Sequence, residues 1–262
     1  MKKILALVLA LCMVFALCAC GKKAAPADSD KAYVQGKGTL IVGITDFEPM
    51  DYKNEAGEWI GFDADMAKAF AEDLGVKAEF IEIDWDNKIL ELNNKSIDCV
   101  WNGMTLTDEV TNSMACGKPY CNNAQVVVVA AASADKYQDV ESLKSLAFAV
   151  EAGSAGEDAA EANGLNYTAV QTQSNALMEV AAGTADACII DLLMAGAMIG
   201  EGTSYPELTY TVKLTTEEYG AGFRQGGDLA AAYDEFYAKA YASGKVMEIA
   251  KLYGVQESII PA

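Results

Sequence analysis

Short apolar runs alternate with helical periods along the chain from residue 38 onward. In the first half, the predicted strands are residues 39–44, 78–83, 98–101 and 125–130, with a short helix at 87–93. Apolar residues on one helical face predict a longer helix after the first strand, and they are Phe62, Met66, Phe70 and Leu74. Asp63 is its expected N-cap and Gly75 its expected C-cap. This alternation predicts parallel sheets with helices on their faces.

The second half repeats the pattern of the first. Its predicted strands are residues 146–150, 167–171, 186–190, 208–214 and 219–224, and its predicted helices are 157–163 and 175–182. Two further apolar helical faces close the chain. A small residue, an Asp, an apolar run and a polar strand end occur in this order twice, as SIDCVWNG and TADACIID. We therefore expect an α/β protein with two similar lobes rather than one long sheet.

Composition narrows the class of partner. Of the 262 residues, 52% are hydrophobic, which is enough for a substantial core. There are 38 acidic residues against 19 basic ones, so the formal net charge is −19 at pH 7. Such a chain is not expected to bind nucleic acid, because phosphate binding needs clustered Lys and Arg. The sequence has no His and no CxxC pair, so neither a metal nor another cofactor is expected.

The N-terminus has the pattern of a secretory signal. Lys2 and Lys3 precede an apolar run that is too short for a membrane span, which indicates a signal peptide over residues 1–19. The run ends in LCACG, which resembles the lipobox of bacterial lipoproteins, so Cys20 is the expected lipid attachment site. Residues 20–37 are small and polar and are expected to form a flexible tether. The expected location is extracytoplasmic, with the lipid on the cell membrane.

Four further cysteines lie in this disulfide-permissive compartment. Cys116 and Cys121 are close enough in sequence to bridge a loop, although spacing alone does not test the geometry. Cys99 and Cys188 lie in apolar runs and are expected to be small buried side chains. The disulfide state of the four thiols stays open at this level.

Several segments, in order and spacing, resemble the extracellular solute-binding proteins of family 3, the polar amino-acid-binding lipoproteins of bacterial ABC importers. The segments are LIVGITDFEPMDY, GEWIGFDADMAKAFAEDLG, DWDNKILELNNKSIDCVWNGMTLTDE, VEAGSAGE, DACIID, EEYGAGFRQGGDL and ASGKVMEIAKLYG. The resemblance covers roughly residues 38–258.

The resemblance implies a two-lobed clamp of the type II periplasmic-binding-protein kind. Two crossing hinge strands, at about 126–130 and 220–224, would join the lobes. Lobe 1 would comprise residues 38–126 and 225–262, and lobe 2 residues 127–224. Ligand would bind between the lobes and favour the closed form, which an ABC permease then recognises. The protein is expected to be a monomer.

The resemblance also implies the ligand-binding residues. Phe47 and Trp85 would stack on the ligand from opposite walls. Backbone and side-chain groups from both lobes would hold its polar ends, and they belong to Asn102, Gly103, Met104, Thr105, Gly153, Ser154 and Ala155. Asp191, at a strand end, would pair with the ligand ammonium, unless it only caps the following helix. Asp46 and Glu48 could reach a cationic side chain, or could lie in a solvated loop.

One position departs from the family pattern. Val110 stands where the family usually has an arginine that binds the ligand carboxylate, and the single arginine, Arg224, lies in a predicted hinge strand. Either backbone donors hold the carboxylate, or the ligand lacks one. With acids and no side-chain base expected in the site, a cationic or neutral amino acid is favoured over a dicarboxylic one.

Two other functions fit the same fold. A sensor would pass the ligand signal to a separate partner, because the chain carries no second membrane segment or kinase. A dehydratase-like enzyme would use carboxylates such as Asp46, Glu48 or Glu151 as acid and base. No nucleophile is visibly paired with a base, so an enzyme is not expected.

Overall fold

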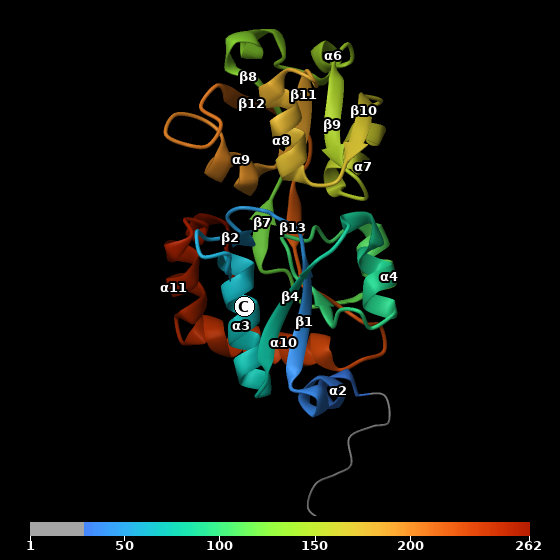
Figure 1. Cartoon of the computed structure of the whole chain (residues 1–262), viewed down its shortest axis with the longest axis vertical. Helices are drawn as coiled ribbons and strands as arrows, with labels where there is room; N and C mark the ends of the chain where they lie inside the picture. Colours follow the sequence, from blue (N-terminus) through green and yellow to red (C-terminus); the bar gives the residue numbers. More distant parts are fainter. Residues whose placement is uncertain (1–28) are drawn as a thin grey trace, which may run out of the picture.

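The computed structural model describes residues 29–262 and contains two α/β lobes, one above the other in Figure 1. Each lobe is built on one five-stranded sheet. In each sheet four strands run in the same direction, and one strand, next to the edge, runs antiparallel to both of its neighbours. The repeat expected from the sequence is therefore present, and the two-lobed fold class is confirmed.

The first lobe contains the strands nearer the N-terminus. Its sheet has the order β4-β1-β5-β14-β6, formed by β4 (Lys77–Glu82), β1 (Thr39–Ile44), β5 (Cys99–Val100), β14 (Gly222–Phe223) and β6 (Ala115–Cys116). Helix α3 (Phe62–Leu74) packs on α11 (Lys245–Leu252) and α10 (Leu229–Ala242), so the C-terminal helices lie on this lobe.

Helix α3 ends as expected and begins differently. Gly75 is its C-cap, with a left-handed φ of 77°. The N-cap is Gly61, so the prediction of Asp63 is wrong. The Asp63 side chain turns inward and accepts hydrogen bonds from the Gly103 N–H and the Tyr120 hydroxyl, both at 2.6 Å. It therefore ties the helix to the loop after β5.

The second lobe has the sheet order β10-β9-β11-β8-β12. Its strands are β10 (Asn166–Val170), β9 (Ala147–Glu151), β11 (Ala187–Asp191), β8 (Gln125–Ala130) and β12 (Leu208–Lys213). The helices α7 (Ala155–Ala162) and α8 (Gln173–Ala182) pack on β9 and β11. The four consecutive valines of β8 are all fully buried, as expected for a central strand.

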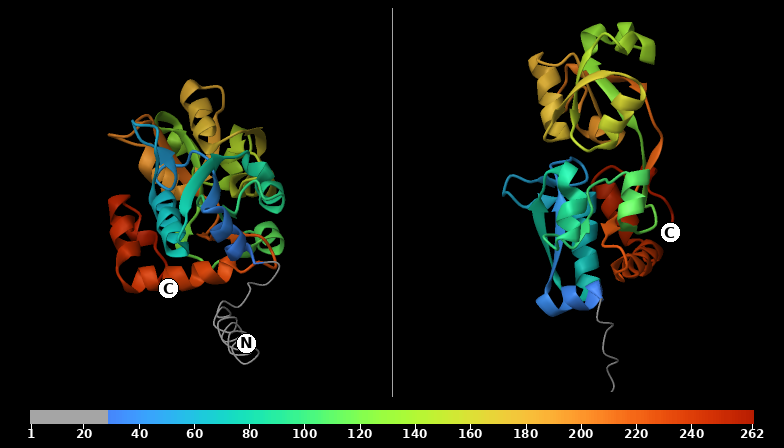
Figure 2. Two further views of the ribbon diagram at one scale, coloured as in Figure 1. Left: turned by 60° about the horizontal axis from the view of Figure 1, so that its bottom comes forward. Right: turned by 90° about the vertical axis from the view of Figure 1, so that its right-hand side faces the viewer.

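Two short antiparallel strands, β7 (Cys121–Asn123) and β13 (Glu217–Tyr219), lie between the two sheets. In the side view of Figure 2 the lobes are joined along one edge. The hinge strands that connect the lobes were expected at about residues 126–130 and 220–224, but those residues pair inside the two five-stranded sheets. The crossing strands therefore lie a few residues earlier on each pass, because the apolar runs are long enough to enter the sheet cores.

Residues 30–37 form a helix and not a tether, so that part of the expectation is wrong. Helix α2 (Asp30–Lys37) is capped by Ser29, whose hydroxyl accepts from the Ala32 N–H at 3.0 Å. Val34 is fully buried, and the Asp30 carboxylate pairs with the Arg224 guanidinium at 2.9 Å. The signal peptide, Cys20 and the rest of the tether lie outside the described residues.

The remaining elements are short. They are β2 (Tyr52–Lys53), β3 (Trp59–Ile60), η1 (Trp85–Asn87), α4 (Lys88–Asn93), α5 (Asp108–Ser113), η2 (Ala131–Lys136), α6 (Val140–Leu143), α9 (Leu192–Met198) and η3 (Gln256–Ser258). Between residues 29 and 262, no helix combines the length and the apolar character that a membrane crossing requires.

Candidate functional site

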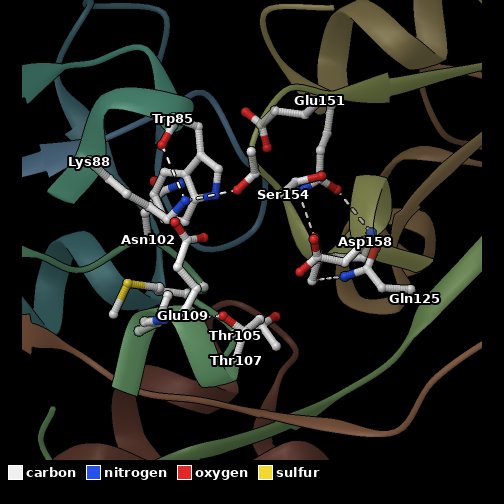
Figure 3. Close-up of a pocket in the computed structure, with 17 residues that line it drawn as sticks. Trp85, Lys88, Asn102, Thr105, Thr107, Glu109, Gln125, Glu151, Ser154 and Asp158 are labelled. Carbon is white, nitrogen blue, oxygen red and sulfur yellow. Dashed lines mark hydrogen bonds between the residues drawn. The ribbon is translucent and has the colours of Figure 1, made fainter. Parts of the chain in front are cut away.

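A pocket lies between the two lobes, where β5, β9 and β11 end (Figure 3). From the first lobe it is lined by Trp85, Lys88, Asn102, Gly103, Met104, Thr105, Thr107, Glu109 and Val110. From the second lobe and β8 it is lined by Gln125, Glu151, Gly153, Ser154, Ala155, Asp158, Gln173 and Asp191. Nine of the residues that were predicted to bind the ligand therefore line this one pocket.

The loop after β5 is fixed by hydrogen bonds from behind. The Asn102 amide accepts from the Thr45 N–H at 3.0 Å and donates to the Thr45 hydroxyl at 2.8 Å. Gly103 has a φ of 55°, and a Cβ there would lie 2.3 Å from the Phe47 ring. Its N–H is engaged by Asp63. This wall is therefore preformed. Backbone groups of this loop were expected to bind the ligand, but the Gly103 N–H is already bonded to Asp63.

Asp191 is the last residue of β11, and its carboxylate accepts hydrogen bonds from four neutral side chains. The Asn123 and Gln125 amides and the Tyr219 hydroxyl donate to Oδ1, and the Gln173 amide donates to Oδ2. Burial, followed by the nearby Glu217 carboxylate, raises the pKa of Asp191 to about 7, although these hydrogen bonds lower it. Asp191 is the residue before α9, but its side chain makes no capping hydrogen bond. Its role is therefore not that of a helix cap.

The turn between β9 and α7 forms the opposite wall. The Ser154 hydroxyl accepts from the Glu157 N–H at 3.1 Å, and the Glu157 carboxylate accepts from the Gly153 N–H at 2.6 Å. Gly153 has a φ of 68°, and a Cβ there would lie 2.7 Å from the Asp86 Cα of the other lobe. A glycine is required here because the two lobes approach this closely.

Lys88 is a pocket residue that the sequence analysis missed. It begins α4, and only 3% of it is exposed. Its ammonium lies 5.2 Å from the Trp85 ring centroid and donates to the Gly153 carbonyl at 2.8 Å. Burial lowers its pKa, while nearby acids, Glu109 first among them, raise it. The expectation that the site holds no side-chain base is therefore wrong.

Glu151 is a second buried pocket residue for which the sequence suggested only an enzymatic role. It ends β9 and is 2% exposed, and its Oε1 has no hydrogen-bond partner among the described residues. Burial, followed by the charge of Asp191, raises its pKa to about 8, while the Gln173 amide and the Lys88 charge lower it. Figure 3 shows Glu151 and Ser154 on one side of the pocket, with Trp85 and Lys88 on the other.

Three expected contacts do not line this pocket. Phe47 is 2% exposed and packs edge-on against Tyr219, so it supports the wall from behind. Asp46 accepts from the Ser174 hydroxyl of the other lobe at 3.2 Å, and burial raises its pKa. Glu48 is half-buried outside the pocket. The large ring of Phe47 packs in the core, whereas the carboxylates of Asp46 and Glu48 lie outside the pocket, at its rim.

The lobes touch along the cleft. Besides the Lys88 contact to Gly153, the Gln171 amide donates to the Asp84 carboxylate at 3.0 Å. The pocket is consequently closed, with charged and amide groups facing each other across it. Such a site can hold a small zwitterionic molecule away from water.

In the part of the chain that the structure describes, the cysteines form no disulfide and the acids no metal-binding group. Cys99, Cys116, Cys121 and Cys188 are free thiols, so Cys116 and Cys121 do not form the bridge that their spacing allowed. Cys99 and Cys188 are buried, as expected. Within residues 29–262, no group of three or more His, Cys, Asp or Glu side chains is arranged to hold a metal ion.

Comparison with known proteins adds independent evidence. Residues 40–256 match the model of the bacterial extracellular solute-binding proteins, family 3. The arginine-binding extracellular protein ArtP of Bacillus subtilis is 31% identical over 201 residues, covering 74% of this chain and 75% of ArtP.

Solved structures are similar over most of the chain. A variant of ArgBP from T. maritima superposes with a TM-score of 0.80 at 28% identity, covering 86% of this chain and 99% of that one. The ancestral amino acid-binding protein AncCDT-1, a precursor of cyclohexadienyl dehydratase, superposes with a TM-score of 0.78 at 29% identity. The superposition covers 86% of this chain and 99% of AncCDT-1.

Proposed function

This chain belongs to family 3 of the bacterial extracellular solute-binding proteins, and we propose that it is the substrate-binding lipoprotein of an amino-acid ABC transporter. It captures a small polar amino acid between its lobes and delivers it to a membrane permease. The observation that carries the proposal is the closed pocket, in which buried charged and amide side chains of both lobes face one another. Open α/β sheets place ligands at this end of their strands.

The proposed ligand contacts come from both walls of the pocket. They are Trp85, Asn102, Gly103, Met104, Thr105, Gly153, Ser154, Ala155 and Asp191. Asp191 keeps acceptor capacity on Oδ2, which receives one hydrogen bond, whereas Oδ1 receives three. At the start of α7, the Ser154 hydroxyl takes the Glu157 N–H, which leaves the Ala155 and Gly156 N–H groups, without a partner among the described residues, for an anionic group.

The pocket charges favour a basic or neutral polar amino acid. Four acidic side chains line it, Glu109, Glu151, Asp158 and Asp191, against one base, Lys88. A second carboxylate on the ligand would meet those acids. The similarity to an arginine-binding protein of Bacillus subtilis points in the same direction.

The proposal includes export and anchoring. Residues 1–19 are the signal peptide, and Cys20 carries the lipid that holds the protein on the outer side of the cell membrane. The lobe boundaries follow the two sheets: residues 29–120 and 220–262 belong to lobe 1, residues 124–216 belong to lobe 2, and β7 and β13 connect them. The chain acts as a monomeric binding protein and not as an enzyme, which agrees with the binding function named for its relatives.

A thermal-shift screen of amino acids, followed by calorimetry, tests this function. At a hundred times its Kd, a ligand adds about 2.7 kcal/mol of stability, which is a rise of about 5–10 °C in Tm for a protein of this size. Arginine, lysine, histidine or glutamine should give such a rise with one site per chain. A shift with glutamate or aspartate alone, or steady turnover of a bound compound, contradicts the proposal.

A further inference from the structure

Lys88 is a buried cation without an ionic partner. Its side chain is buried at the start of α4, and among residues 29–262 no carboxylate lies within ion-pair distance of its ammonium. Burying a charged ammonium without a counter-charge is unfavourable by several kcal/mol. Such a group is kept only where something else compensates its charge.

The contacts that Lys88 does make are to carbonyl oxygens. The distance to the Gly153 carbonyl is 2.8 Å and that to the Trp85 carbonyl is 3.4 Å. An ammonium has three N–H donors, so at least one of them is left for a group inside the pocket. The Trp85 ring, 5.2 Å from the ammonium, covers another side of it. The free donor therefore has a restricted range of directions.

The acids around Lys88 are held apart from it. Glu109, Glu151, Asp86 and Asp158 all act on its pKa through their charge, but none forms an ion pair with it. Among residues 29–262, no group donates a hydrogen bond to Glu151 Oε1. Within the described residues, the pocket thus contains an ammonium without an ionic partner and a Glu151 oxygen without a hydrogen-bond partner. A ligand with an anionic group for Lys88 and a hydrogen-bonding group for Glu151 fits between them.

We propose that Lys88 binds the carboxylate of the amino acid and determines that the protein selects amino acids over the corresponding amines. The inference rests on the proposed function. Val110, on the same wall, is apolar and offers no charge. Lys88 thus supplies the basic side chain that the sequence analysis did not find in the site.

The contact between Lys88 and Gly153 raises an alternative role. Because the two residues belong to different lobes, the hydrogen bond could serve only as a latch that holds the lobes together. A latch strengthens the binding of every ligand that requires closure. A carboxylate-binding cation strengthens only ligands that carry a carboxylate.

Calorimetry with matched ligand pairs separates the two roles. The probes are arginine with agmatine, lysine with cadaverine, and histidine with histamine, each amine lacking only the carboxylate. The variants are Lys88→Met, which removes the charge, and Lys88→Gln, which keeps an N–H donor for the Gly153 carbonyl. Lys144→Met, at an exposed lysine of the second lobe, is the matched control. Circular dichroism melting checks that every variant is folded.

For the amino acid that the wild type binds, both Lys88 variants should lose about tenfold to a hundredfold in affinity. Their affinity for the paired amine should change by less than about threefold, and the control should match the wild type. Equal losses for the amino acid and the amine identify a latch and overturn the inference. An unchanged affinity of the Lys88 variants for the amino acid also overturns the inference. Neither of these two outcomes contradicts the proposed amino-acid-binding function. A wild type that binds none of the amino acids contradicts the proposed function, and the inference falls with it.

Discussion

Asp191 shows what a buried carboxylate needs from its surroundings. It is 3% exposed, and four side-chain donors from β7, β8, α8 and β13 converge on it. The donors belong to the crossing strands as well as to the second lobe. Asp191 therefore organises the floor of the pocket, in addition to any contact with the ligand.

Replacing Asp191 with alanine should destabilise the protein even without ligand. Buried donors left without an acceptor cost about 1–3 kcal/mol each, although neighbouring groups will rearrange. We expect the free energy of unfolding in urea to fall by about 3 kcal/mol. Glu109→Ala, at an exposed acid of the same pocket, is the control and should change it by less than about 0.5 kcal/mol. A fully stable Asp191→Ala protein would show that the network does not contribute to folding.

Asp63 should make stability depend on pH. Burial raises its pKa from the ordinary 3.8 to about 7, although hydrogen bonds from Tyr120 and Gly103 lower it. The folded protein then keeps a proton between pH 4 and pH 7 that the unfolded chain releases, so stability falls as pH rises. The full difference corresponds to about 4 kcal/mol. Burial also raises the pKa of the adjacent Asp51, which acts in the same direction.

Urea unfolding between pH 4 and pH 8 measures this dependence. The wild type should lose stability across the range, and Asp63→Asn should lose distinctly less. Asp73→Asn, at an exposed position of the same helix, should follow the wild type. Superimposable profiles for the wild type and Asp63→Asn would show that Asp63 is ionised throughout.

The positions of some pocket residues were predictable from sequence and those of others were not. Asp191 ends an apolar strand and Ser154 lies in the turn after another, where polar groups meet in open α/β sheets. Glu151 carries the same signal, since it directly follows the apolar residues of β9. Lys88 carries none, because a single lysine between Asn87 and Ile89 gives no sign of burial, and its contact to Gly153 joins residues 65 positions apart in the sequence.

At the scale of elements, local pattern was sufficient where apolar residues are dense. The observed bounds of β1 and β8 are those expected, because each strand is an almost unbroken apolar run. Helix α2 was missed because Val34 is its only fully buried apolar residue. It is held in place by Arg224, which lies 194 residues away from Asp30 in the sequence. No local pattern can report such a contact.

Arg224 should be a structural residue and not a ligand-binding one. Its guanidinium pairs with Asp30 of α2 and with Asp98 before β5, and it donates to the Ile97 carbonyl at 2.7 Å. Removing one partner of a buried ion pair costs about 3–5 kcal/mol. Arg224→Met should lower the free energy of unfolding by that amount.

The ligand preference of Arg224→Met should equal that of the wild type, measured by calorimetry with arginine and agmatine. Lys118→Met, at an exposed position of the same lobe, should leave both stability and preference unchanged. A changed preference between arginine and agmatine would place Arg224 in the binding mechanism.

At the scale of the whole molecule, the two lobes are joined by β7 and β13 and touch across the cleft through few polar contacts. Those contacts are too sparse to bury much apolar surface, so the ligand must supply most of the free energy of closure. A ligand that binds the closed form better than the open form shifts the population toward it. Capture by closure of the two lobes therefore requires an open form in the absence of ligand.

Small-angle X-ray scattering, with and without the amino acid that gives the largest thermal shift, tests this requirement most directly. The radius of gyration should decrease at saturating ligand, and it should stay unchanged when glutamate is added at the same concentration. The scattering of the bound form should fit the closed arrangement of Figure 1. An identical radius of gyration with and without a ligand that calorimetry shows to be bound would contradict capture by closure of the two lobes.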